Sequence, residues 1–412
     1  MKKLVVIGFV WPEPATTAAG HRMVQLLETF LGLGWSVTFA TTATKTEYSI
    51  DLETLGLKTA FIQLNHTSFD DFIRDQDPHY VIFDRFMVEE QFGWRVAEQV
   101  PRAIRILNTE DLHSLRKTRE ICHKNDEDFS LRKWKWNAMT QREIASIYRS
   151  DLSLVVSTFE MDLLKNELNI PEILLHHLPF MLNEITEDIQ KRWPTFKERT
   201  DFITYGNGKH TPNIDATIYL KEKIWPKIRK HLPDANLKIF GAYLPKAILN
   251  LHDPKEQFYV MGWKKNLDSE VRKARVLLAP LRFGAGIKGK ITDSLKNGTP
   301  VVTTKVGAEG MALHFLPHQL VDRMDAEGFV EAAIQLYSNQ ELWYRAQKKG
   351  TVSLNSNYSK KKLLPQLRQN LETIGGNLPG HRERNYIGIL LQHQNFAATK
   401  YMGKWIEAKN KD

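Results

Sequence analysis

The chain has 412 residues, enough for two domains that each bury a hydrophobic core. Its composition, with 42% apolar and 25% charged residues, is typical of a globular protein, and no apolar run approaches the roughly 18 residues of a membrane-spanning helix. The single cysteine, Cys122, excludes an intrachain disulfide and a thiolate zinc site. The formal charge of +9 favours anionic partners such as nucleotides or acidic lipid surfaces, whereas no nucleic-acid-binding signature is present.

The first residues, MKKLVVIGFVWP, imitate a secretory signal with two lysines before an apolar run. Trp11-Pro12-Glu13-Pro14 interrupts that run where a cleavage region should begin. We therefore predict a buried first strand over Leu4–Gly8 and a cytoplasmic protein.

The N-terminal half alternates apolar runs with helical patterns such as His21–Leu33. A charged and mostly helical insertion is expected over Leu112–Arg149. The runs predict buried parallel strands at Ser36–Ala40, Thr59–Leu64, Tyr80–Phe83, Ala103–Leu107 and Leu152–Ser157.

Residues 181–200 are polar and suit a linker, after which the alternation begins again. The predicted fold class is α/β, with two facing doubly wound parallel-sheet domains over residues 1–185 and 200–375. A last helix, Asn395–Ala408, is expected after a glycine loop, and residues 385–412 would complete the first domain. The strands predicted for the second domain are Phe202–Tyr205, Leu237–Phe240, Tyr259–Gly262, Val276–Leu281, Pro300–Thr304 and Leu320–Val321, with helices at Asn213–Lys230 and Ala326–Tyr337.

Residues 276–310 carry the clearest chemical signal. An apolar run ends in a glycine-broken cationic loop, a short helix follows, and a second apolar run leads to a second glycine turn. Ligands collect at the carboxyl ends of such parallel strands, where glycines let backbone N–H groups approach a phosphate. The loop residues expected to hold a diphosphate are Arg282, Gly284, Gly286, Lys288 and Lys290.

Two other interpretations of this loop remain open. Gly284–Gly289 contains a literal G-x-G-x-x-G string with Glu309 beyond it, as in dinucleotide-binding folds. Its place deep in the second domain and the lysine among its variable positions argue against a dehydrogenase. A solvated basic turn without a ligand is the other alternative.

GAGIKGKITDSLKNGTPVVTTKVGAEGM resembles the donor-site segment of GT-B retaining glycosyltransferases, close to family 4 (glycosyl transferases group 1). Lys288 and Lys290 match the family's basic pair, and Asp293 matches its ribose-binding acidic residue. Two further segments, Ile203–Ala216 and Met261–Pro280, also resemble the family. The donor site that the resemblance implies comprises Gly206, Asn207, Gly208, His210, Gly262, Trp263, Arg282, Gly284, Gly286, Lys288, Lys290, Asp293, Gly307 and Glu309.

One departure from the family concerns its E-x7-E pair. The first glutamate is replaced by Ala285, and the second acidic residue is Asp293. A contact to the donor sugar is therefore absent or supplied by another residue.

The N-terminal domain supplies candidate acceptor or cleft residues. Gly20 and Arg22 belong to the loop after the first strand, and Asp84 and Arg85 follow another strand; ordinary helix starts are the alternative. The cluster at residues 108–113 places polar groups at a third strand end, where substrate hydroxyls would lie. The expected catalytic residues are Lys288, Glu110, Asp111 and His113.

Two further motifs have plainer interpretations. Asp126-Glu127-Asp128 imitates a metal-binding D-x-D motif, but it follows no strand and is predicted to be a solvated acidic run, so no metal or cofactor is expected. Residues 132–136 (RKWKW) interleave cations with tryptophans, as peripheral membrane segments do, although both rings packing on the sheet is the alternative.

The resemblance implies metal-independent transfer of a sugar, with retention, from a UDP- or GDP-linked donor to a glycan or glycolipid acceptor. It implies a role in bacterial polysaccharide biosynthesis in the cytoplasm or at the inner face of the membrane. A nucleotide-sugar epimerase of the same fold and a catalytically silent carbohydrate-binding scaffold are the alternatives.

Overall fold

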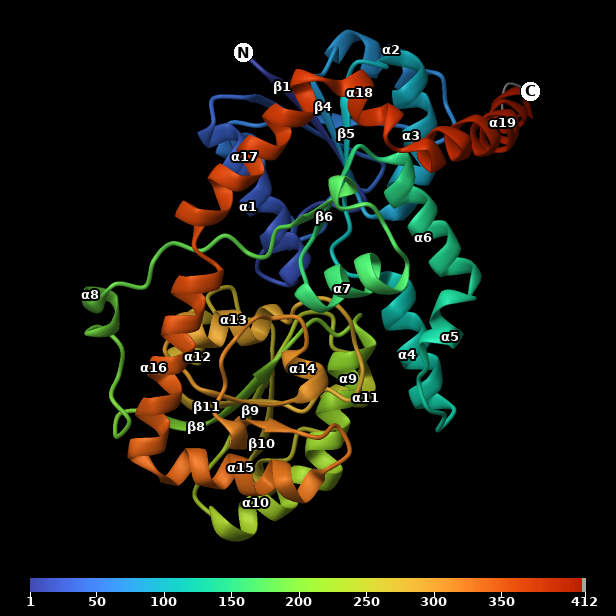
Figure 1. Ribbon diagram of the computed structural model, residues 1–412. Coiled ribbons are helices and arrows are strands. Elements are labelled where there is room, and N and C mark those ends of the chain that lie inside the picture. The colour runs from blue at the N-terminus through green and yellow to red at the C-terminus, as the bar shows by residue number, and fades with distance from the viewer. Residues whose placement is uncertain (410–412) are drawn as a thin grey trace.

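The computed structural model describes residues 1–409, with the side chains of residues 394–399 excepted. Two α/β units, each built on a parallel sheet, lie one above the other (Figure 1). The predicted fold class is confirmed, because the alternation of buried apolar runs with amphipathic segments produces two strand-helix-strand series.

The first sheet has the order β3-β2-β1-β4-β5-β6-β7, and all its pairs are parallel. Its central strands are buried almost throughout, which explains their continuous apolar runs. The strands are β1 (Lys3–Gly8), β2 (Ser36–Thr41), β3 (Lys58–Phe61), β4 (Tyr80–Asp84), β5 (Ile104–Asn108), β6 (Leu152–Val155) and β7 (Leu175–His177).

The second sheet has the order β10-β9-β8-β11-β12-β13 and is also parallel. In both sheets the first strand in sequence lies between its second and fourth, so the connections diverge there and open a crevice at the carboxyl ends. The strands are β8 (Thr200–Tyr205), β9 (Leu237–Phe240), β10 (Phe258–Gly262), β11 (Ala274–Ala279), β12 (Val301–Thr304) and β13 (Leu320–Val321).

Helices cover both sheets. Those of the first half are α1 (Ala18–Gly32), α2 (Ser68–Gln76), α3 (Phe86–Gln99), α4 (His113–Lys124), α5 (Leu131–Lys135), α6 (Ala138–Arg149), α7 (Thr158–Asp162) and α8 (Glu187–Gln190). The later ones are α9 (Thr211–Tyr219), α10 (Trp225–His231), α11 (Lys246–Leu249), α12 (Asp268–Lys273), α13 (Gly289–Lys296), α14 (Lys305–Ala308), α15 (Ala326–Ser338), α16 (Gln340–Asn357), α17 (Lys360–Gly376), α18 (Leu378–Glu383) and α19 (Tyr386–Lys409). Short 3-10 or π turns lie at Glu53–Leu55, Leu163–Glu167, Glu172–Leu174, Leu220–Ile224, Pro254–Glu256 and Pro317–Gln319.

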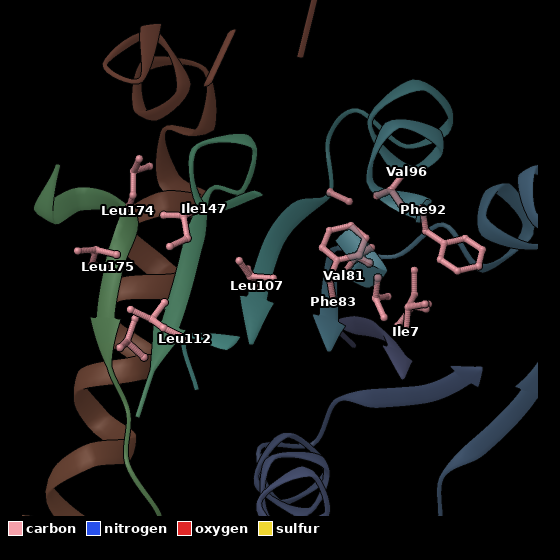
Figure 2. Close-up of a cluster of buried hydrophobic side chains, with 14 of the residues drawn as sticks. Ile7, Val81, Phe83, Phe92, Val96, Leu107, Leu112, Ile147, Leu174 and Leu175 are labelled. Atoms are coloured by element: carbon pink, nitrogen blue, oxygen red, sulfur yellow. The ribbon is translucent and has the colours of Figure 1, made fainter. Parts of the chain in front are cut away.

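Each unit has its own hydrophobic core. One core cluster of the first unit, drawn in Figure 2, joins Ile7, Val81 and Phe83 of the sheet to Phe92 of α3 and Ile147 of α6. Buried side chains of the second unit pack around β8, β9, β11 and β12. Burial of these apolar surfaces is the main stabilising contribution, at about 25 cal/mol for each Å².

The chain passes to the second unit through residues 182–199, which form little regular structure apart from α8, and it returns to the first at α17. Leu363, Leu367, Leu371 and Ile374 of α17 pack in a core cluster of the first unit. We therefore propose that the second domain ends near Tyr358 rather than at residue 375.

Three local expectations were wrong. The strand β7 was missed, because its three residues include two histidines and carry no apolar run. The glycine stretch near residue 375 was expected to be a loop but is helical, because packing of the apolar stripe of α17 overrides the weak helix propensity of glycine. The last helix begins at Tyr386, earlier than expected.

Within residues 1–409, no helix combines the length and the apolar character that a membrane span requires.

Candidate active site

A cavity of about 1020 Å³ lies between the two units, lined from both sides by loops at the carboxyl ends of the strands. From the first unit it is lined by the loop after β1, the end of β4 and the loop after β5. From the second unit it is lined by the loops after β8, β10 and β11. The predicted site residues that line it are Gly20, Arg22, Asp84, Arg85, Glu110, Asp111, His113, Gly206, Asn207, His210, Trp263, Gly284, Gly286, Lys288, Lys290 and Asp293.

The cationic loop after β11 brings both of its lysines to this cavity. Lys288 is 9% exposed, and its Nζ donates to the carbonyl of Gly286 at 2.9 Å. Lys290 Nζ donates to Asn213 Oδ1 at 2.8 Å. Burial lowers the pKa of Lys288 to about 8 and that of Lys290 to about 7. Two lysine amino groups with little water around them thus line the cavity, and an anionic ligand would favour their protonated forms.

The start of α13 is held close to the first unit. A Cβ at Gly289 would lie 2.6 Å from the Cβ of Ala18 in α1, so only glycine allows this approach. The first turn of α13 therefore presents its backbone N–H groups at the cavity, beside the two lysines.

Asp293 lies one turn further along α13 and lines the cavity. Burial raises the pKa of its carboxyl group, while Lys296 and His21 act in the opposite direction. His21 belongs to α1, so titratable side chains of both units lie near this part of the cavity.

The loop after β8 and the start of α9 line the cavity beside the two lysines. Asn213 Nδ2 donates to the carbonyl of Asn207 at 3.0 Å, and a Cβ at Gly206 would lie 2.5 Å from the Asn213 side chain. Burial lowers the pKa of His210 to about 4, so this imidazole is neutral at pH 7. A neutral imidazole can donate one hydrogen bond but supplies no charge to a phosphate.

Trp263 follows β10 and is 39% exposed at the rim of the cavity. Its Nε1 donates to the carbonyl of Ala15 at 3.2 Å, and its ring centroid lies 4.8 Å from that of Tyr48. Both partners belong to the first unit, so this indole lies where the two units meet.

Five of the predicted donor residues do not line the cavity: Gly208, Gly262, Arg282, Gly307 and Glu309. Arg282 pairs with Asp215 of α9 at 2.5 Å, and Glu309 forms a bidentate ion pair with Arg119 of α4 at 2.6 and 3.0 Å. Their charges are used in contacts between protein side chains, which a loop pattern in the sequence does not reveal.

The first unit contributes a buried polar cluster. Asn108 Nδ2 donates to Glu110 Oε1 at 2.7 Å and to Asp84 Oδ1 at 3.4 Å. The fully buried Arg22 donates to Asn108 Oδ1 at 3.4 Å and lies 4.0 Å from Glu110. Burial raises the pKa of Glu110 to about 7, against the opposing effect of Arg22.

Asp111 and His113 form a separate group beside this cluster. Arg116 Nε donates to Asp111 Oδ2 at 2.6 Å, and His113 Nδ1 lies 3.1 Å from Asp111 Oδ1. Although burial acts in the opposite direction, Arg116 and His113 hold the pKa of Asp111 well below its usual range. Burial lowers the pKa of His113, so Asp111 is charged and His113 neutral at pH 7.

Two backbone conformations on the first unit's wall of the cavity are unusual. Arg85 has φ +77° and Glu110 has φ +60°, and both residues stand where a strand of the first sheet ends. Non-glycine residues with a positive φ are strained and are often found at ligand sites, where the surrounding structure holds them in that conformation. The guanidinium of Arg85 stacks over the ring of Phe9 with 4.9 Å to the centroid.

Contacts between the units were missed at the sequence level. Glu160 Oε1 accepts from the backbone N–H of Gly286 at 2.7 Å, and Tyr243 OH donates to Glu13 Oε1 at 2.9 Å. Ser157 and Glu160 match an S-x-x-E capping box, and that signal predicts only a helix start.

The two remaining motifs behave differently. Asp126, Glu127 and Asp128 are exposed, as predicted, and among the described residues no group of three or more His, Cys, Asp or Glu is placed to hold a metal ion. Trp134 is fully buried and donates to Ser114 Oγ at 2.9 Å, whereas Trp136 is 77% exposed. Only one of the two rings in residues 132–136 is therefore available to a surface partner.

Comparison with known proteins gives the site its context. Residues 199–339 match the family model "Glycosyl transferases group 1". No curated protein sequence matches the chain.

Solved structures are similar over nearly the whole chain. Sucrose-phosphate synthase from Thermosynechococcus elongatus has a TM-score of 0.69 at 14% identity, covering 91% of this chain and 99% of that one. A TarM variant from S. aureus, solved with fondaparinux, α-GlcNAc-glycerol and UDP, has a TM-score of 0.69 at 9% identity, covering 90% and 100%. HepE from Anabaena, solved with UDP-glucose, has a TM-score of 0.66 at 9% identity, covering 90% and 100%.

The family match spans the unit that carries the lysine loop, and the structural matches span both units. This chain therefore has the GT-B fold, and its second domain matches the family model of the glycosyl transferases of group 1.

Proposed function

We propose that the protein transfers a sugar from a nucleoside diphosphate sugar to an acceptor hydroxyl, with retention at the anomeric carbon and without a bound metal ion. The observation that carries this proposal is the pair of partly desolvated lysines, Lys288 and Lys290, which face a cavity whose opposite wall carries Glu110.

The donor would bind on the second domain, with its diphosphate against Lys288, Lys290 and the first turn of α13. The ribose would lie on Asp293, and Trp263 would border the base. When the bond between the anomeric carbon and the diphosphate oxygen breaks, negative charge grows on the leaving group. Cations fixed in advance stabilise that charge more than they stabilise the bound donor, so they accelerate the reaction. The two lysines would take the role that a divalent cation has in metal-dependent transferases.

The acceptor would lie on the first domain near Glu110, Asp111 and His113. Its hydroxyl oxygen forms the new bond to the anomeric carbon and gives up one proton. In the retaining mechanism that the family resemblance implies, the leaving phosphate assists this proton transfer. Glu110 is a second proton acceptor at this wall, because a carboxyl group with a pKa of about 7 changes its protonation near neutral pH.

Two of the similar structures were solved with UDP or UDP-glucose, which makes a UDP-linked donor the first to test. A thermal-shift screen of UDP, GDP, ADP, CMP and their sugars should single out one base. A specific binder stabilises the fold by about 2.7 kcal/mol at a hundredfold excess over Kd. No response to any nucleotide would contradict the proposal.

The nucleotide sugar of the selected base should then be incubated with hydroxyl acceptors, in buffer with and without EDTA. Transfer that persists in EDTA, with an anomeric configuration equal to that of the donor by NMR, is the expected result. Formation of an epimer without an acceptor would instead identify an epimerase. Tight nucleotide binding without turnover on any acceptor would identify a silent scaffold.

A further inference from the structure

Ala285 is the residue that departs from the family pattern, and both of its neighbours in the chain form hydrogen bonds with the first domain. The carbonyl of Gly284 accepts from Arg119 Nη1 at 2.9 Å. The backbone N–H of Gly286 donates to Glu160 Oε1 at 2.7 Å. Arg119 lies in α4 and Glu160 in α7, so both partners come from the domain opposite the one that carries the lysine loop.

The side chain of Ala285 packs against the core cluster of the first domain that Figure 2 shows. The backbone at Gly286 is left-handed, with φ +63°, and a Cβ there would lie 2.8 Å from the Cβ of Asp111. The loop therefore touches the first domain at van der Waals distance, with little space for larger side chains. Ala285 is partly buried, and a glutamate at this position would place a carboxylate beside the apolar side chains of this cluster.

Glu160 is fully buried, and its Oε1 also accepts from the backbone N–H of Leu112 at 3.1 Å. Its second oxygen, Oε2, has no hydrogen-bond partner among the described residues. Three charged or titratable groups face this carboxyl group: Asp111 from the loop after β5, Glu143 from α6 and Lys288 from the second domain. Burial, together with the two carboxyl groups, raises the pKa of Glu160 to about 8.

The carboxyl group of Glu160 accepts hydrogen bonds from backbone amides of both domains. One oxygen holds the amide of Leu112, next to the predicted acceptor residues Asp111 and His113, and also the amide of Gly286, two residues before Lys288. Lys288 Nζ in turn bonds the carbonyl of Gly286. A shift of Gly286 would therefore move the ammonium group of Lys288 as well.

We propose that Glu160 and Arg119 are positioning residues that clamp the diphosphate loop to the first domain and so orient Lys288 toward the donor. Since the loop is taken to hold a diphosphate, this inference rests on the proposed function. Its consequence is that the donor site is complete only when the cleft is closed on the domain that carries the acceptor.

Hydrogen exchange of the full-length protein tests the clamp without any ligand. In Glu160→Ala and in Arg119→Ala, the peptide covering residues 282–290 should exchange at least tenfold faster than in the wild type. In Glu160→Gln the exchange should remain near the wild-type rate, because the amide oxygen still accepts both N–H groups. Glu89→Gln is the matched control: this buried carboxylate pairs with Arg149 inside the first domain, so its loss destabilises the domain without touching the loop.

Wild-type exchange of the loop in both alanine variants would overturn the proposal. So would equal acceleration in Glu89→Gln, which would make the effect one of general destabilisation, or failure of Glu160→Gln to restore protection. Pyrophosphate added to the wild type is the separate arm for the proposed function, and it should slow exchange of the same peptide. No effect of pyrophosphate would count against the diphosphate site, whereas the ligand-free comparison decides the clamp.

Discussion

Replacing Lys288 by methionine should affect activity and stability in opposite directions. Methionine keeps the length and apolar stem of lysine but removes the ammonium group. If this group stabilises the leaving diphosphate, kcat/KM should fall about a hundred- to thousandfold, as when one donor to a developing oxyanion is lost.

The expected gain in stability follows from the pKa of Lys288. A value of about 8, in place of the ordinary 10.5, corresponds to about 3 kcal/mol by which the fold disfavours the charged form. Below pH 8 the lysine is protonated in both the folded and the unfolded chain, so the wild type bears this whole cost. Between pH 8 and 10.5 the folded chain releases its proton first and the cost shrinks. Loss of the hydrogen bond to the carbonyl of Gly286 offsets about 1 kcal/mol, which leaves Lys288→Met about 2 kcal/mol more stable at pH 7.

Denaturant unfolding at pH 7 and at pH 10, together with initial rates of transfer, measures both quantities. Lys273→Met, at a 73% exposed lysine of the same domain, is the control and should change neither. A Lys288→Met variant that is inactive and also less stable than the wild type at pH 7 would refute the reasoning, because inactivity would then reflect damage to the fold.

Three further outcomes are expected. Burial lowers the pKa of Lys290 to about 7, so the affinity for the nucleoside diphosphate should weaken as pH rises from 7 to 9. Calorimetry in buffers of different ionisation enthalpy should show proton uptake on binding near pH 8. Binding without proton uptake would contradict this role of Lys290. Gly310→Ala would place a Cβ 1.8 Å from Ser157 Oγ of the first domain, at a residue whose φ is +69°. The substitution should lower the free energy of unfolding by about 1–3 kcal/mol and raise the radius of gyration in small-angle scattering. The control Gly32→Ala, whose Cβ would meet nothing within 4 Å, should do neither. The rate of sugar transfer by the wild type should rise through about pH 7 as Glu110 loses its proton. Glu110→Gln should be about a hundredfold slower or more, and its rate should not show this rise with pH. A variant with an unchanged pH profile would show that Glu110 takes no part in proton transfer.

The cavity-lining residues of the lysine loop after β11 could be predicted because their signal is local. Glycines that permit a tight turn, lysines at fixed spacing and a following helix lie within one short stretch, and all of them came together at the cavity. Arg282 and Glu309 lie in the same stretch, yet their charges are bound by Asp215 and Arg119. The sequence shows which charges exist but not which are already paired.

Trp134 and Trp136 illustrate the same limit. Two positions apart in one cationic segment, they look equivalent in the sequence, but one ring is fully buried and the other is exposed. The direction of each side chain depends on how α5 packs on its neighbours, which the segment alone does not encode.

The sequence by itself determined the two parallel sheets and the cationic, glycine-rich character of the lysine loop, because strand periodicity, glycine turns and lysine spacing act over a few residues. Only the tertiary structure decided what stands opposite that loop. Glu160 and Gly286 lie far apart in the chain and meet through the packing of two domains, so no local pattern announces their hydrogen bond. The same packing places the side chain of Ala285 against the core of the other domain.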